Sequence, residues 1–157
     1  VMIERGTEVG GGDLRSMVGT IARIDEIEVS PDGRYGLVAV GTARCRVLAW
    51  LPDDPYPLAD VERWDDDPSA AGRSEVADRH RRVREINSLA RSLGDAVPDD
   101  DQIADDPWLG CFHLAALAPL GASDRQRVLA APSLSARLDL LDEALDDAMA
   151  VLDFRRS

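Results

Sequence analysis

The alternation of hydrophobic and polar positions divides the chain into a front part patterned like β-strands and a rear part patterned like α-helices. In the front part, two apolar runs between Val18 and Leu51 flank Ser30-Pro31-Asp32-Gly33, a quartet typical of tight turns. We therefore expect an antiparallel hairpin in this region. Along the first run, apolar residues fall at even positions at Ala22 and Ile24 and at odd positions from Ile27. This shift by one residue predicts a β-bulge at about Asp25-Glu26.

The second arm of this hairpin is expected to continue into a meander. The run Leu37 to Val40 is apolar on both phases, which predicts a central strand covered on both faces. Gly41-Thr42 is expected to end that strand, and the alternation from Cys45 to Leu51 predicts another. A rigid turn at residues 52–57 then leads to a strand from Leu58 to Trp64. The inward face of the strand at 45–51 is predicted to carry Cys45, Val47, Ala49 and Leu51.

The rear part contains helical periodicities with recognisable ends. Ser74 is predicted to cap a first helix, and Gly94 is positioned to stop it. Asp106-Pro107 is predicted to open a second, largely buried helix that ends before Pro119. Ser123-Asp124-Arg125-Gln126 matches a capping box and predicts the start of a short third helix.

Pro132-Ser133 is predicted to start the last and most strongly patterned helix. Its acidic residues lie mostly away from one continuous apolar stripe, so we interpret this helix as a packing element. The stripe consists of Leu134, Leu138, Leu141, Leu145, Ala148 and Leu152.

The composition changes at Asp65 to Gly72, where acids, proline and small residues without periodicity indicate a linker. We therefore expect an α+β chain, with a β-rich part at residues 1–67 and a helical part at residues 68–157. Because the chain begins abruptly with apolar residues at Val1, we also expect that strands of the same sheet precede it.

The charge of the chain argues against a nucleic-acid partner. Thirty acidic residues against 18 basic ones give a net charge of −12, a field that repels a phosphate backbone. We therefore interpret the basic helix face at Arg79, Arg81, Arg82 and Arg84 as paired with acids rather than as a nucleic-acid patch. The absence of lysine excludes P-loop, Ser-Lys and pyridoxal chemistry for this chain. No segment has membrane-spanning length, so we expect no membrane partner.

Few residues are candidates for catalysis or for binding a metal ion or cofactor. Cys45 and Cys111 lie among apolar neighbours, which indicates unpaired thiols and a reducing, cytoplasmic setting. Cys111 and His113 are two residues apart on a predicted helix and cannot share a metal ion, and His80 has no local nucleophile. The glycine-rich stretch Glu8 to Asp13 lacks the third glycine of a dinucleotide loop, and the aspartate clusters lack EF-hand spacing. We expect no catalytic residue, cofactor or metal, and hence no enzyme.

A series of short motifs runs through nearly the whole chain. In the β-rich part these are Ile3-Glu4-Arg5-Gly6, Gly19-Thr20 with Ala22-x-Ile24, Gly41-x-x-Arg44-x-Arg46-Val47, and Tyr56 with Ala59 and Val61. In the helical part they are Arg125-Gln126-Arg127-Val128-Leu129, Leu134, Arg137-Leu138 and Leu141. In this order and spacing they resemble the Lon N-terminal, substrate-binding domain family.

The resemblance implies a PUA-like β pseudo-barrel followed by a helical bundle. It also implies a module that helps proteases of this kind to recognise unfolded or damaged polypeptides. The family's opening β-segment is missing before Val1, so we expect an incomplete barrel. These 157 residues do not include the family's ATPase and protease domains, so we expect neither activity from this chain.

Our leading hypothesis is a non-catalytic module that binds unfolded or damaged polypeptides through exposed apolar or aromatic surface on the β-part, and through an available strand edge. Tyr56, Leu58 and Trp64 are the candidate contact residues, because they lie on a late, weakly patterned strand; packing in the barrel is the alternative role for them. A second hypothesis is an adaptor that docks a folded protein through the helical part. A third is a hydrolase, which would need Cys45 or Cys111 in a cleft with a histidine.

Overall fold

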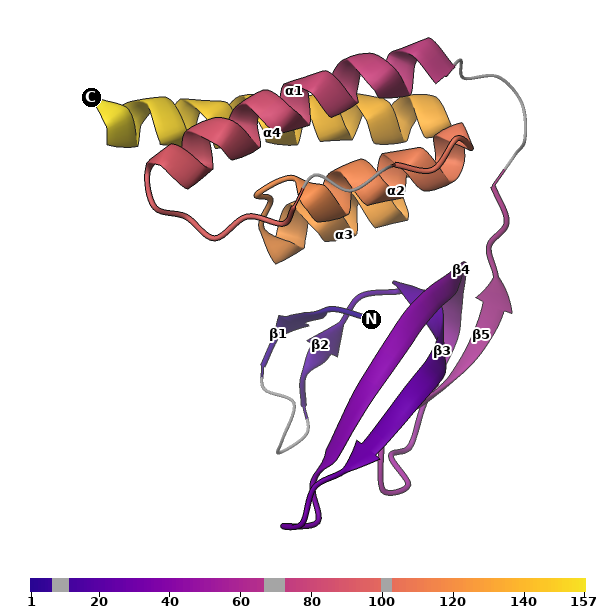
Figure 1. Ribbon diagram of the computed structural model, residues 1–157. Helices are drawn as coiled ribbons and strands as arrows, with labels where there is room; N and C mark the ends of the chain where they lie inside the picture. Colours follow the sequence, from indigo (N-terminus) through magenta and orange to yellow (C-terminus); the bar gives the residue numbers. More distant parts are fainter. Residues whose placement is uncertain (7–11, 67–72, 100–102) are drawn as a thin grey trace. The chain divides into compact units, whose positions relative to one another are not determined.

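The computed structural model describes residues 1–6, 12–66, 73–99 and 103–157 (Figure 1). Its contacts separate two compact units, a strand-rich unit Val1–Asp65 and a helical unit Asp66–Ser157. The α+β class expected from the sequence is confirmed. The predicted boundary between residues 67 and 68, and most of the glycine-rich stretch at 8–13, lie outside the described residues.

The strand-rich unit contains two antiparallel sheets. One pairs β1 with β2, and the other has the strand order β3-β4-β5. Within the described part of the chain these strands do not close into a barrel. Their bounds are β1 Ile3–Arg5, β2 Leu14–Arg15, β3 Val18–Val29, β4 Tyr35–Leu51 and β5 Leu58–Arg63.

The predicted hairpin between β3 and β4 is confirmed. Gly33 has a φ of +83°, which a glycine adopts without steric cost, and its N–H donates to the Ser30 carbonyl over 2.9 Å. The Ser30 N–H donates to the Arg34 carbonyl over 2.8 Å and closes the turn. The predicted bulge is also confirmed, because the register shifts between Ile24 and Glu26.

The predicted break at Gly41-Thr42 is wrong. Strand β4 runs through this dipeptide without interruption for 17 residues. The pairs Ala22↔Gly41 and Ile21↔Ala43 leave Thr42 as an extra residue, so a bulge absorbs the irregularity. The Thr42 hydroxyl donates to the Ile21 carbonyl over 3.0 Å, which holds the bulge against β3.

A further bulge corrects the predicted inward face of β4. The pairs Val47↔Val61 and Ala49↔Asp60 leave Leu48 as the extra residue and shift the alternation by one. Cys45 and Val47 are buried as predicted, whereas Ala49 and Leu51 are exposed.

The prediction that Leu37 to Val40 is covered on both faces is wrong. Strand β5 pairs only with the Cys45–Leu51 part of β4, so the first half of β4 has β3 as its one neighbouring strand among the described residues. Leu37, Val38 and Val40 are 56%, 52% and 45% exposed. The apolar residues on both faces of this part of β4 therefore lie in a two-stranded ribbon that is exposed to solvent.

The helical unit contains four helices whose ends follow local capping rules. They are α1 Arg73–Ser92, α2 Pro107–Leu117, α3 Ala122–Ala130 and α4 Leu134–Arg156. Gly94 has a φ of +89° and ends α1 as predicted, with the Asp95 N–H donating to the Ala90 carbonyl over 3.0 Å. The carboxylate of Asp106 accepts from the Leu109 N–H at 2.9 Å and caps α2.

Capping also fixes the start of the last helix, but two other predicted helix starts are wrong. The Ser133 hydroxyl accepts from the Ala136 N–H at 3.2 Å and caps α4 as predicted. Helix α3 begins one residue before Ser123, with Gly121 as its N-cap, so no capping box forms. Helix α1 begins at Arg73 and places Ser74 inside its first turn rather than ahead of it.

The core of the helical unit is built around the predicted stripe of α4. All five leucines of the stripe are at most 3% exposed, and Ala148 packs beside them in part. They contact buried residues of the other three helices, among them Ile86, Leu114 and Val128. Burial of each leucine is worth about 1.5–3 kcal/mol, which makes α4 the main packing element, as predicted.

The interpretation of the basic face of α1 as paired with acids is confirmed for three of its four arginines. Arg79 forms an ion pair of 2.5 Å with Asp142 of α4, and Arg82 forms ion pairs with Asp142 and Asp146. Arg81 pairs with Asp78 of its own helix at 3.0 Å. In the part of the chain that the structure describes, no helix is long and apolar enough to cross a membrane.

Candidate functional site

The most distinctive surface of the strand-rich unit is an exposed apolar face on the β3–β4 hairpin. Residues directly opposite each other on antiparallel strands share a face of the sheet. In three such pairs both residues have apolar or aromatic side chains, and five of the six residues are more than half exposed. We call these six residues the apolar hairpin face: Ile24/Ala39, Ile27/Leu37 and Val29/Tyr35.

The bulge at Asp25 creates this face. Side chains alternate along a strand, so in a regular β3 Ile24 would point away from Ile27 and Val29. The extra residue restores Ile24 to their face. Glu26 and Glu28 therefore lie on the opposite face, where they pair with Val38 and Gly36 of β4.

The hairpin also offers backbone hydrogen-bonding groups. Strand β3 lies at one end of the strand order β3-β4-β5, and no other strand of the described chain pairs with its outer side. An unpaired edge can accept an additional strand, and its neighbouring side chains then select what binds. Beyond Thr20, every residue of β3 is exposed.

The three residues predicted as contacts are not brought together into one patch. Tyr56 lies in the loop before β5 and is 63% exposed. Leu58 begins β5 opposite Leu51 and is half-buried, whereas Trp64 directly follows the end of β5. Six residues of extended chain place Leu58 and Trp64 about 20 Å apart.

Trp64 is covered by two arginines. The guanidinium carbons of Arg44 and Arg46 lie 4.0 and 3.8 Å from the ring centroid, which is cation–π geometry. The backbone N–H of Trp64 donates to the Arg44 carbonyl over 2.9 Å. Both guanidinium groups therefore pack on the Trp64 ring, whereas Tyr56 is exposed and Leu58 is half-buried.

Sequence reasoning did not identify the apolar hairpin face. The second arm was interpreted as a covered strand because both of its phases are apolar. A usable signal lies in the first arm, where Asp25, Glu26 and Glu28 are interspersed with isoleucine and valine. Three acids in a strand partner argue for an exposed ribbon rather than for a buried one.

An open pocket of about 420 Å³ lies elsewhere in the strand-rich unit, around Arg15 and Trp50. The Arg15 guanidinium pairs with Asp13 at 2.5 Å and with Asp53 at 3.6 Å, and it lies 5.0 Å from the Trp50 ring centroid. The hydrogen bond from Arg15 lowers the pKa of Asp13. Three charged groups of this pocket, those of Arg15, Asp13 and Asp53, are therefore already paired within the chain.

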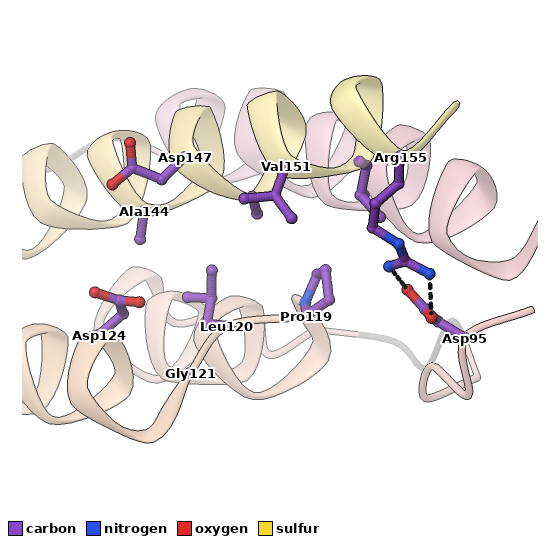
Figure 2. Close-up of a pocket in the computed structure, with 11 residues that line it drawn as sticks. Asp95, Pro119, Leu120, Gly121, Asp124, Ala144, Asp147, Val151 and Arg155 are labelled. Atoms are coloured by element: carbon purple, nitrogen blue, oxygen red, sulfur yellow. Dashed lines mark hydrogen bonds and ion pairs between the residues drawn. The ribbon is translucent and has the colours of Figure 1, made fainter. Parts of the chain in front are cut away.

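A second pocket, of about 250 Å³, lies in the helical unit between α4 and the start of α3 (Figure 2). Its apolar lining includes Leu120 from the connection before α3 and Ala144 and Val151 from α4. Asp124 and Asp147 lie at one end of the pocket, and Asp95 and Arg155 at the other. Arg155 donates two hydrogen bonds of 2.6 and 2.9 Å to the carboxylate of Asp95, and these bonds lower the pKa of Asp95.

The candidate nucleophiles are held in structural environments. Cys45 and Cys111 are free and buried, as predicted. Burial raises the pKa of the Cys111 thiol to about 11, which suppresses the reactive thiolate. His113 Nδ1 accepts from the Ala104 N–H at 3.2 Å. Within the described ranges, no group of three or more His, Cys, Asp or Glu residues is arranged to hold a metal ion.

Comparison with known proteins supplies the family. Residues 5–147 match the model of the ATP-dependent protease La (LON) substrate-binding domain. Lon protease of Anaeromyxobacter dehalogenans is 31% identical over an alignment of 152 residues that covers 91% of this chain and 17% of the relative. Lon protease 2 of Myxococcus xanthus is 30% identical over an alignment of 150 residues that covers 91% of this chain and 18% of the relative. The chain thus spans about a sixth of the length of these curated relatives.

Solved structures agree on the fold. The crystal structure of a Lon N-terminal domain protein from Xanthomonas campestris has a TM-score of 0.60 and 22% identity, covering 82% of this chain and 68% of that one. The N-terminal domain of Mycobacterium avium complex Lon protease has a TM-score of 0.54 and 19% identity, covering 83% and 70%. The family match over most of the chain shows that this protein belongs to the ATP-dependent protease La (LON) substrate-binding domain family.

Proposed function

We propose that this protein recognises unfolded or damaged polypeptides through the apolar hairpin face and catalyses no reaction itself. The observation that carries the proposal is the set of three cross-strand pairs exposed on one face of β3 and β4. Membership of a substrate-binding domain family supports a role in selecting polypeptides for proteolysis.

An exposed apolar ribbon suits the recognition of unfolded chains. Unfolded polypeptides differ from folded ones chiefly by their exposed apolar side chains, which this face can bury. Full burial of a side chain such as Ile27 or Leu37 is worth about 1.5–3 kcal/mol, and the cost of association offsets much of the total. The expected affinity is therefore micromolar and tolerant of sequence.

The edge of β3 adds a second element to the proposal. A polypeptide segment laid along this edge would form main-chain hydrogen bonds with β3, which require no particular side chains. Its alternate side chains would lie beside Ile24 and Ile27 on the apolar hairpin face. Tyr56 and Leu58 are proposed as additional contacts, and Trp64 as a residue that supports the sheet.

Several observations support a binding role without catalysis. The Cys111 thiol is buried with a raised pKa, and His113 is engaged by a backbone N–H. We further propose a reducing, cytoplasmic setting, supported by two cysteines that remain unpaired. The net charge of −12 disfavours a nucleic-acid partner.

The proposal is tested by measuring binding to a reduced and alkylated model protein labelled with fluorescein. Fluorescence anisotropy should give saturable micromolar binding for the unaltered protein. The double variant Ile27→Lys/Leu37→Lys should bind at least about tenfold more weakly, because it places two charges in the apolar face. Both residues are exposed, so circular dichroism should show an unchanged fold.

A matched control variant is Leu109→Lys/Phe154→Lys. It makes the same change of charge at two exposed apolar residues of the helical unit and should bind like the unaltered protein. Equal loss in both variants would assign the effect to net charge. Absence of saturable binding by the unaltered protein up to several hundred micromolar would refute the proposed function.

A further inference from the structure

We propose that the pocket between α3 and α4 binds a lysine or arginine side chain that lies next to an apolar residue in a polypeptide. This inference rests on the proposed function for the kind of ligand, and it names a sequence preference and a second site. The pocket lies wholly within the helical unit, so its geometry is independent of the hairpin.

The size of the pocket fits side chains better than a cofactor. Drug-sized ligands and cofactors occupy pockets of about 300–1,000 Å³. This pocket has about 250 Å³ and an open mouth, which is enough for one long side chain and part of its neighbour.

The charge of the pocket is asymmetric. At one end Asp95 and Arg155 neutralise each other through two hydrogen bonds. At the other end Asp124 and Asp147 come from α3 and α4 (Figure 2). Asp124 forms an ion pair of 3.6 Å with Arg127, which also pairs with Glu143, whereas Asp147 is exposed and forms no ion pair with another residue that the structure describes. This end therefore favours a cation and repels a carboxylate.

The apolar part of the pocket completes the match to a basic side chain. Leu120 and Val151 lie between the two ends, Ala144 lies beside Asp124 and Asp147, and Val151 is 58% exposed. Lysine and arginine place their aliphatic stems on apolar surface while their charged heads stay in polar surroundings. A stem over these residues would bring the head to Asp124 and Asp147.

The test uses three peptides, Ac-Gly-Leu-Arg-Gly-NH₂ and the same sequence with Gln or Glu in place of Arg. Each is titrated into the ¹⁵N-labelled full chain, and the amide shifts of α4 and the start of α3 are followed by NMR. We expect the arginine peptide to bind at least about fivefold more tightly than the glutamine peptide, and the glutamate peptide to be weakest. Equal affinity of the three, or shifts confined to other regions, would overturn the inference.

Variants separate the pocket from general electrostatics. Asp124→Asn/Asp147→Asn should abolish the preference for arginine over glutamine. The control Asp105→Asn/Asp139→Asn makes the same change of charge at exposed acids outside the pocket and should preserve the preference. Equal loss of the arginine preference in both variants would refute the assignment of the pocket as the binding site.

The same variants distinguish failure of this inference from failure of the proposed function. The hairpin variant Ile27→Lys/Leu37→Lys should keep its arginine-peptide preference. If the reduced and alkylated model protein does not bind while the arginine peptide still shifts the amide signals of the pocket residues, the proposed function fails and the pocket assignment stands. If the unfolded protein binds but the peptides show no preference, the pocket assignment fails alone.

Discussion

The buried ion pair between Arg137 and Asp66 leads to an asymmetric prediction for stability. The Arg137 side chain is fully buried and donates from Nη2 to Asp66 at 2.9 Å, while Asp66 keeps 19% of its side chain exposed. The guanidinium carbon lies 4.0 Å from the Phe112 ring centroid. Nε and Nη1 have no hydrogen-bond partner among the described residues. Removing the acid should therefore destabilise the protein far more than removing the arginine.

The magnitudes follow from what each substitution leaves behind. Asp66→Asn leaves a positive charge in the core without its carboxylate, which costs about 3–5 kcal/mol. Arg137→Met removes the charge and two unpaired donors and retains a long apolar side chain against Phe112. The partly solvated Asp66 tolerates the loss of its partner, so the net cost should be below about 1.5 kcal/mol. The double variant should resemble Arg137→Met.

Urea unfolding followed by circular dichroism at 222 nm measures these differences. With a slope of about 1–3 kcal/mol per molar urea, a loss of 3 kcal/mol moves the midpoint by about 1–3 M. Glu143→Gln is the matched control, because it removes a carboxylate from an exposed pair with Arg127 and should hardly move the midpoint. If Arg137→Met destabilises as much as Asp66→Asn, the argument from the uncompensated charge is refuted.

Three further predictions test caps, pH dependence and thiol reactivity. Ser133→Ala should cost about 1 kcal/mol in urea unfolding because it removes a helix cap, whereas Ser123→Ala should have almost no effect; equal costs would contradict the cap assignment. Hydrogen bonds from Arg155 lower the pKa of Asp95, so their contribution is full above the ordinary value of 3.8 and is lost as the pH falls through the lowered value. Asp95→Asn should therefore destabilise the protein at pH 6 but not at pH 2, and the reverse order would refute this. With the pKa of Cys111 near 11, iodoacetamide at pH 8 should label it at least about 100-fold more slowly in the folded chain than in urea, as measured by mass spectrometry; equal rates would contradict its burial.

The sequence predicted features whose causes are local. The turn at Ser30–Gly33, the caps at Asp106 and Ser133 and the stop at Gly94 all depend on the chemistry of a few adjacent residues. The leucine stripe of α4 was equally predictable, because its helical period depends only on residues within one helix.

Features that depend on distant pairing were not predictable in the same way. The bulges at Thr42 and Leu48 are set by the register of β4 against β3 and β5, and neither residue type marks a bulge. Exposure of Leu37 was missed for a related reason. An apolar run indicates what a strand could bury, but its burial depends on which elements pack against it.

The candidate site illustrates the same limit. Tyr56 was predicted from a weakly patterned stretch and is exposed, whereas Trp64 came from the same stretch and is covered by Arg44 and Arg46. Pattern alone could not separate them, because the two arginines reach Trp64 only through the pairing of β4 with β5.

The bulge at Asp25 connects the fold to the proposed function. A single residue decides whether Ile24 joins Ile27 on the apolar hairpin face, since a shift of one reverses every side chain beyond it. Deleting Asp25 removes the extra residue, so Ile24 and Ile27 become two positions apart on a regular β3 and still share a face opposite Ala39 and Leu37. The deletion should therefore keep the apolar hairpin face, and polypeptide binding should stay within about twofold of that of the unaltered protein. Clearly weaker binding with an unchanged circular dichroism spectrum would show that the local shape of the bulge, rather than the shared apolar face alone, governs recognition.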